Sequence, residues 1–133
     1  MRGGSFLDTN VLIYALAEDD RRTPRADALL AEGGTISVQV LNEFTAVARR
    51  KLRLDWPQIA DLIRVARRLC GPVMPMSENV HDAARRLAEQ HDFSFYDALI
   101  VASALEAGCT TLWSEDMQNG RAIEGLTIRN PFS

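Results

Sequence analysis

The feature that most constrains this chain is the stretch over residues 6–14, Phe6-Leu7-Asp8-Thr9-Asn10-Val11-Leu12-Ile13-Tyr14. Three polar residues separate an apolar pair from a longer apolar run, which predicts a short buried strand over about residues 5–7 and a helix over about residues 11–17. In open α/β sheets, ligands bind beyond the carboxyl ends of the strands. Asp8 therefore has two interpretations: it belongs to a chemical site, or it caps the helix that follows.

The composition is that of an ordinary globular domain. At 133 residues, with 47% hydrophobic and 25% charged residues, the chain is large enough for one domain with a substantial core. A formal net charge of −3 excludes a chain that binds nucleic acid as a polycation, although it leaves room for a local basic surface. Almost all basic residues are Arg, which suits bidentate contacts to phosphate or carboxylate, and Lys51 is the only lysine.

Cysteine usage and hydropathy indicate the compartment. Cys70 and Cys109 are far apart and lack the spacing of a metal or redox site, which is typical of buried thiols in a reducing cytoplasm. The two histidines do not have the spacing of a zinc site. No apolar run approaches the length of a membrane span, and no basic-then-apolar signal peptide opens the chain. We therefore expect a cytoplasmic protein with no membrane contact.

Short apolar segments alternate with helical patterns along the chain, without a repeat or linker. This alternation predicts a single α/β domain over residues 1–133, with a central, mostly parallel sheet of about five short strands flanked by helices. The predicted strands lie at residues 5–7, 35–37, 73–74, 110–113 and 126–128. Helix starts are indicated by Thr23 before Pro24, by Asp55 before Trp56-Pro57, by Ser77, and by Tyr96-Asp97.

Four carboxylates occupy positions that matter in such a fold. Asp8 and Asp116 each follow a predicted strand, so both should emerge at one edge of a parallel sheet. Asp97 begins an unusually apolar helix, where the positive end of the helix dipole favours a carboxylate. Glu43 lies in a helix between apolar neighbours, and an inward-facing charge there would be costly without a partner. Taken singly, each has an ordinary alternative as a cap, a loop acid or a solvated helix residue.

Together these acids suggest a metal site. Four carboxylates that converge without balancing bases repel one another, and a divalent cation resolves the conflict. Mg²⁺ prefers oxygen ligands and sites shared with phosphate, and Mn²⁺ suits the same ligands. The chemistry that such a site performs is hydrolysis of a phosphodiester bond.

A basic segment follows the helix that carries Glu43. We expect its four cations to contact nucleic-acid phosphates, which set position and affinity rather than sequence choice. These residues are Arg49, Arg50, Lys51 and Arg53. The alternative is a solvated helix end that complements the helix dipole. Trp56 could stack on a base, although a place in the core or at a helix start is the more ordinary role for it.

Four motifs follow one another along the chain: Leu7-Asp8-Thr9-Asn10-Val11-Leu12, Asn42-Glu43-Phe44, Tyr96-Asp97-Ala98-Leu99-Ile100-Val101-Ala102-Ser103-Ala104 and Leu112-Trp113-Ser114-Glu115-Asp116-Met117. Their order resembles that of PIN-domain nucleases. The chain resembles this family over nearly its whole length. Its size is similar to that of the VapC toxins of bacterial toxin–antitoxin pairs. The resemblance implies a PIN-like domain over residues 1–133.

Carried over residue by residue, the resemblance implies a catalytic, metal-binding set and a supporting set. The first set is Asp8, Glu43, Asp97 and Asp116, and the second is Thr9, Asn10 and Ser114. Glu115 is a lesser candidate, because it should point elsewhere from the same turn. The implied activity is that of a Mg²⁺- or Mn²⁺-dependent endoribonuclease acting on RNA. The implied partners are a second copy in a homodimer and a cognate antitoxin whose tail occupies the acidic groove.

Three other functions stay open from the sequence. A PIN-type nuclease could process RNA without being a toxin. A phosphatase with Asp8 as nucleophile would normally carry a second Asp where Asn10 stands, and a lysine better placed than Lys51. A non-catalytic module that binds metal and a partner would normally need a lysine near the last strands, and the sequence has none there.

Overall fold

The central sheet holds the site-bearing strands side by side. The computed structural model describes residues 4–133, so residues 1–3 of the predicted domain lie outside the described residues. Four strands pair in the order β1-β4-β6-β5. They are β1 (Ser5–Leu7), β4 (Thr111–Trp113), β5 (Ala122–Ile123) and β6 (Leu126–Arg129). Strands β1, β4 and β6 run parallel, and β5 pairs antiparallel with β6 at the edge.

A second pair of strands continues the sheet beyond β1. β2 (Ile36–Ser37) and β3 (Val73–Met74) pair in parallel. An isolated bridge joins Phe6 to Thr35, with the Thr35 N–H donating to the Ser5 carbonyl at 2.9 Å. The predicted α/β fold with a mostly parallel sheet is thus confirmed. The short strand β5 was not predicted; the turn that leads out of it has positive φ at Glu124 and Gly125.

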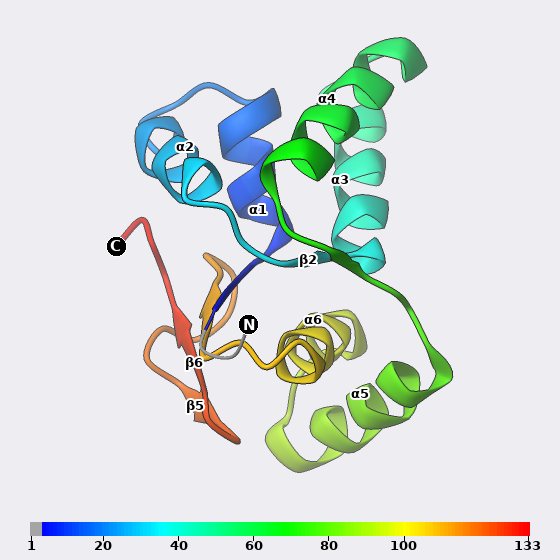
Figure 1. Ribbon diagram of the computed structural model, residues 1–133, viewed down its shortest axis with the longest axis vertical. Coiled ribbons are helices and arrows are strands. Elements are labelled where there is room, and N and C mark those ends of the chain that lie inside the picture. The colour runs from blue at the N-terminus through cyan, green and yellow to red at the C-terminus, as the bar shows by residue number, and fades with distance from the viewer. Residues whose placement is uncertain (1–3) are drawn as a thin grey trace.

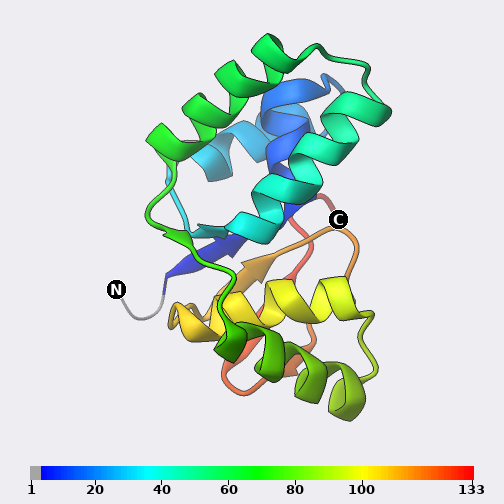
Figure 2. The same ribbon diagram turned by 90° about the vertical axis from the view of Figure 1, so that its right-hand side faces the viewer.

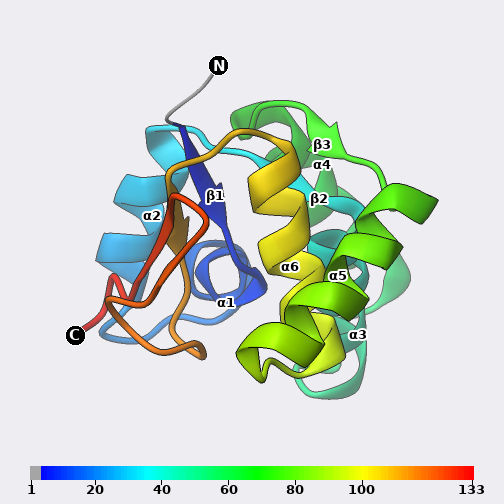
Figure 3. The ribbon, with the colours of Figure 1, turned by 90° about the horizontal axis from the view of Figure 1, so that it is seen from below.

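Helices cover the sheet on both faces. They are α1 (Thr9–Leu12), the π-helical turn η1 (Ile13–Ala17), α2 (Thr23–Ala31), α3 (Val38–Arg50), α4 (Trp56–Leu69), α5 (Glu78–His91) and α6 (Phe95–Glu106). Figure 1 shows α1 to α4 gathered at one end of the molecule, and Figure 2 shows α5 and α6 together at the other. Seen from below, α2 and α6 lie on opposite sides of β1 (Figure 3).

The helix starts differ from the prediction in two places. Thr23 does not cap α2: Arg22 occupies the cap position, and Thr23 is already helical, its hydroxyl donating to the Glu18 carbonyl at 3.0 Å. Helix α6 begins at Phe95, one residue earlier than predicted, because the Ser94 hydroxyl accepts the N–H of Asp97. Asp97 is therefore the third helical residue, within the first turn, where the dipole argument still applies.

Helix α6 carries apolar residues on every side because it lies within the core. Residues 98–104 of this helix are all buried, between the sheet and α5. Both cysteines are free and buried, as predicted. Among the helices of residues 4–133, none combines the length and apolar character needed to cross a bilayer.

Candidate functional site

The register of β1 with β4 places Asp8 beside Ser114. Leu7 pairs with Trp113, and the Asp8 N–H donates to the Trp113 carbonyl at 3.0 Å, so the residues that follow the two strands lie at one edge. The Ser114 hydroxyl donates to one oxygen of the Asp8 carboxylate at 2.7 Å, and the Thr9 N–H donates to the other at 2.7 Å. The second contact means that Asp8 also caps α1, so the two interpretations of this residue do not exclude each other.

Asp8 is an acid in a place that disfavours charge. Its exposed fraction is only 4%, and burial is the largest cause that raises its pKa, to about 7. The charges of Glu43 and Asp116 raise it further, while the hydrogen bonds from Ser114 and Thr9 oppose the rise. Two further carboxylates therefore act directly on this buried one.

Glu43 faces inward from α3. The Thr9 hydroxyl donates to one of its carboxylate oxygens at 2.7 Å, and the Gln39 amide donates to the other at 3.1 Å. The side chain is half-buried. Because its contact Thr9 lies 34 residues away at the start of α1, Glu43 is not a helix residue that merely faces solvent.

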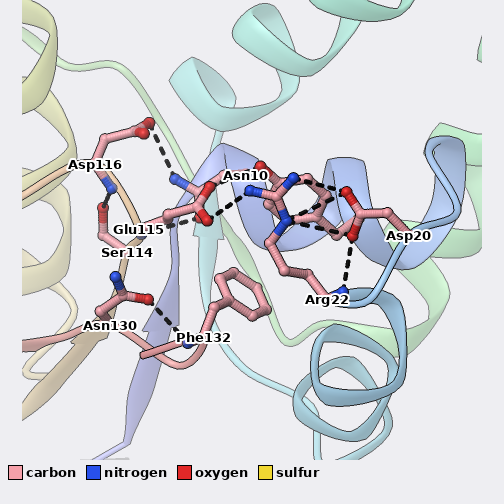
Figure 4. Close-up of polar contacts among 9 residues, drawn as sticks. Asn10, Asp20, Arg22, Ser114, Glu115, Asp116, Asn130 and Phe132 are labelled. Atoms are coloured by element: carbon pink, nitrogen blue, oxygen red, sulfur yellow. Dashed lines mark hydrogen bonds and ion pairs between the residues drawn. The ribbon is translucent and has the colours of Figure 1, made fainter.

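Asp116 belongs to a short turn that follows β4. The Asn10 amide donates to the Asp116 carboxylate at 3.1 Å, and the same amide group accepts the Glu115 N–H at 3.2 Å (Figure 4). The Ser114 hydroxyl accepts the Asp116 N–H at 3.3 Å. Asn10 and Ser114, expected as supporting residues, thus both contact the turn that carries this acid.

Asp97 completes the group electrostatically. Burial is the first cause that raises its pKa, followed by the charges of Asp116 and Glu43, while the Ser94 hydroxyl lowers it. Glu43 and Asp116 therefore act on both Asp8 and Asp97. The acids come from four different segments of the chain, and Glu43 and Asp116 link Asp8 to Asp97 electrostatically.

A cavity of about 390 Å³ opens beside these acids. Its wall comes from α1, η1, α3 and the turn after β4, and includes Glu43, Glu115 and Asp116. In the described part of the chain, Lys51 is the one cation that lines it. Asp8 and Asp97 are not part of the wall, but Thr9, which bonds Glu43, is. The cavity therefore offers carboxylate, hydroxyl and amide oxygens together with a single positive charge.

Comparison with known proteins identifies the family. The PIN domain model matches residues 5–121, which is most of the chain. The chain belongs to the PIN-domain family. No curated protein sequence matches this PIN domain closely enough to count.

Three solved structures share the fold of this PIN domain. Mycobacterium tuberculosis VapC20, described as a sarcin–ricin loop cleaving toxin, has a TM-score of 0.68 and 22% identity over 84% of this chain and 89% of that one. A toxin–antitoxin complex from Klebsiella pneumoniae has a TM-score of 0.70 and 20% identity, over 96% of this chain and 97% of that one. Rickettsia felis VapBC2, bound to a promoter DNA fragment, has a TM-score of 0.65 and 22% identity, over 95% of this chain and 97% of that one.

The donor set of the PIN domain suits a hard cation, and PIN nucleases generally use divalent metal ions. Its acidic side chains offer only oxygen, the ligand that Mg²⁺ and Mn²⁺ prefer. In residues 4–133, no three acidic, His or Cys side chains form a preassembled cage. Neutral donors hold the acids instead: Thr9 and Gln39 hold Glu43, and Asn10 holds Asp116.

The predicted basic cluster lies at the end of α3. Arg50, Lys51 and Arg53 are exposed, and Arg53 adopts positive φ of 58°. The Arg49 guanidinium donates to the Leu54 carbonyl at 3.2 Å and lies 5.0 Å from the centre of the Trp56 ring. Trp56 opens α4 with an exposed fraction of 58%, so its place is at a helix start and not in the core.

Sequence reasoning named Glu115 as a lesser candidate but missed its two partners beside the cavity, Tyr14 and Arg22. Glu115 accepts the Tyr14 hydroxyl at 2.6 Å and the Arg22 guanidinium at 2.8 Å. Burial acts to raise the pKa of Glu115, but these two donors outweigh it and lower the pKa below its usual range. No local pattern marks this group, because the partners of Glu115 lie 101 and 93 residues away.

Proposed function

We propose that this PIN domain is a divalent-metal-dependent endoribonuclease and the toxin of a type II toxin–antitoxin pair. One observation carries the proposal. In this member of the PIN-domain family, the Asp8 carboxylate is buried at the end of β1, and the negative charges of Glu43 and Asp116 raise its pKa. Such an arrangement of acids is stabilised by a cation, which is also what RNA hydrolysis needs there.

In this proposal, Asp8, Glu43, Asp97 and Asp116 hold Mg²⁺ or Mn²⁺. When bound, the ion supplies positive charge to the scissile phosphate and lowers the pKa of a water molecule. The remaining roles belong to the chain itself. Thr9 orients Glu43, Asn10 orients Asp116, and Ser114 orients Asp8 through the hydrogen bonds already described.

The basic cluster would bind the RNA backbone. Arg49, Arg50, Lys51 and Arg53 lie at the α3 end, and Lys51 lines the cavity that Glu43 and Asp116 also line. A cation at this position partly offsets the repulsion between carboxylates and an incoming phosphate. The contacts are to phosphate, so they set affinity and position rather than sequence choice.

We further propose a cognate antitoxin and a homodimer as the partners of this chain. Two of the similar structures are a toxin–antitoxin complex and a VapBC2 assembly, which supports an antitoxin partner. Induction of the protein should stop growth, and co-expression of a small DNA-binding protein encoded next to it should restore growth. Cleavage without growth arrest would instead favour a PIN nuclease of RNA processing. Light scattering of the purified protein should give twice the mass of 14.8 kDa.

Cleavage of RNA by the purified protein tests the activity. Total RNA is incubated with the wild-type protein in Mn²⁺ and in chelator, and the new ends are sequenced. Asp97→Asn should abolish cleavage, because it removes a charge that the ion needs. Asp82→Asn makes the same substitution on the exposed face of α5, where Asp82 pairs only with Arg85 and His81, and should cleave as the wild type does. Full activity of Asp97→Asn would overturn the site assignment.

A further inference from the structure

Glu115 is held on both sides by side chains from distant segments. The Tyr14 hydroxyl, from η1, donates to one carboxylate oxygen at 2.6 Å. The Arg22 guanidinium donates to the other at 2.8 Å (Figure 4). The exposed fractions of the Arg22 and Glu115 side chains are 25% and 23%, so this ion pair is partly shielded from solvent. Such charge-assisted bonds are stronger and more directional than those of an exposed pair.

Arg22 is itself fixed by other groups. It donates to the Asp20 carboxylate at 2.7 Å, and its guanidinium lies 4.0 Å from the centre of the Tyr14 ring. The Tyr14 ring in turn meets the Phe132 ring edge-on, at 5.3 Å between centroids. We call Tyr14, Asp20, Arg22 and Glu115 the Arg22 cluster. It joins η1, the segment before α2 and the turn after β4.

This cluster connects to the acidic site through the backbone of that turn. Glu115 precedes Asp116, and its N–H donates to the Asn10 amide that also holds the Asp116 carboxylate. The Ser114 hydroxyl accepts the N–H groups of Asp116 and Met117. The Asp116 side chain is exposed, so packing does not fix it. Its position depends on the turn, which is held at Glu115 in addition to the buried Ser114 and Met117.

We infer that Arg22 is a positioning residue, which holds the turn after β4 through Glu115 so that Asp116 stays at the cavity that Glu43 also lines. The inference rests on the proposed function in one respect, the role of Asp116 as a ligand of the ion. Loss of Arg22 frees one side of Glu115, and the turn then gains freedom that ion binding must remove. Residues that orient metal ligands in this way commonly change metal affinity or activity by about 10- to 100-fold when substituted.

The test compares two variants with a matched control. Arg22→Met keeps a long apolar side chain on the Tyr14 ring but removes the ion pair, and Tyr14→Phe removes only the hydroxyl. Arg85→Met makes the same Arg substitution in the exposed Asp82–Arg85 pair of α5. Mn²⁺ binding is measured by calorimetry without RNA, and cleavage is measured at saturating Mn²⁺. We expect Arg22→Met to weaken Mn²⁺ binding about 10-fold and lower kcat, with KM for RNA unchanged. Arg85→Met should change neither quantity.

Two further variants separate the possible outcomes. If Arg22 acts through Glu115, the double variant Arg22→Met with Glu115→Gln should bind Mn²⁺ no worse than the weaker single variant. Wild-type Mn²⁺ affinity in both Arg22→Met and Tyr14→Phe would overturn the inference, and so would losses that add in the double variant.

If Asp116→Asn weakens Mn²⁺ binding and these variants do not, only the inference fails. If the wild type binds no Mn²⁺, the proposed function fails first. Should Arg22→Met not fold, Arg22→Gln takes its place, because Tyr14→Phe leaves the Arg22–Glu115 contact intact.

Discussion

Asp8 is the residue at which burial and charge conflict most directly. Its pKa is raised from 3.8 to about 7, so the folded protein holds the Asp8 proton more tightly than the unfolded chain does. This group therefore stabilises the metal-free fold below about pH 4. That contribution is lost as the pH rises through about 7, and reaches at most about 4 kcal/mol.

Asp8→Asn tests this conflict, because an amide cannot ionise. We expect the free energy of unfolding of the variant minus that of the wild type to be larger at pH 8 than at pH 5, because only the wild type loses stability over this range. Urea unfolding of both proteins in chelator at the two pH values measures the difference. An identical gap at pH 5 and pH 8 would show that Asp8 does not titrate between them.

Lys51 is the cation of the cavity wall among residues 4–133, so Lys51→Gln should weaken RNA binding at every sequence and reduce the salt dependence of binding. One lost contact to a single strand lowers the slope of log affinity against log salt by about 0.7. RNA is titrated into the Asp97→Asn variant, which should not cleave it, and into the Asp97→Asn, Lys51→Gln double variant. The slope is measured between 50 and 200 mM salt. Arg86→Gln, on exposed α5, is the control; an equal slope change there would indicate only a net-charge effect.

Helix α6 shows how an element positions a site residue. Its cap is Ser94, whose hydroxyl accepts the Asp97 N–H at 3.2 Å. Ser94→Ala should cost about 1 kcal/mol in the free energy of unfolding, whereas Ser94→Asn should cost far less. Thermal or urea unfolding measures both. Full stability of Ser94→Ala would mean that the tertiary packing of residues 98–104 fixes the start of this helix without the cap.

Elements with strong local patterns could be predicted, and those set by tertiary contacts could not. Caps at Asp55 and Ser77 were visible in the sequence and are confirmed. Thr23 resembles a cap, but the Glu18 carbonyl and the Asp20 N–H engage its hydroxyl from the preceding loop instead. Strand β5 was missed because two residues at a sheet edge carry too little alternation to indicate a strand.

At the scale of the whole molecule, topology accounts for what could be predicted about the site. Parallel strands end at one edge of a sheet, so the proximity of Asp8 to the turn carrying Asp116 follows from strand order. Glu43 faces inward because the Thr9 hydroxyl bonds its carboxylate. The sequence positions of the two residues suggested a shared site but did not show this contact. The Arg22 cluster could not be foreseen, because its ion pairs depend on how η1 and the turn after β4 meet in space.

The pairing of β1 with β4 also has a consequence for synthesis. These strands are neighbours in space, yet their paired residues Leu7 and Trp113 are far apart in the sequence. A ribosome therefore releases Asp8 long before it makes Ser114, whose hydroxyl donates to the Asp8 carboxylate in the fold. A fragment that stops before β4 contains Asp8 without this hydrogen-bond partner.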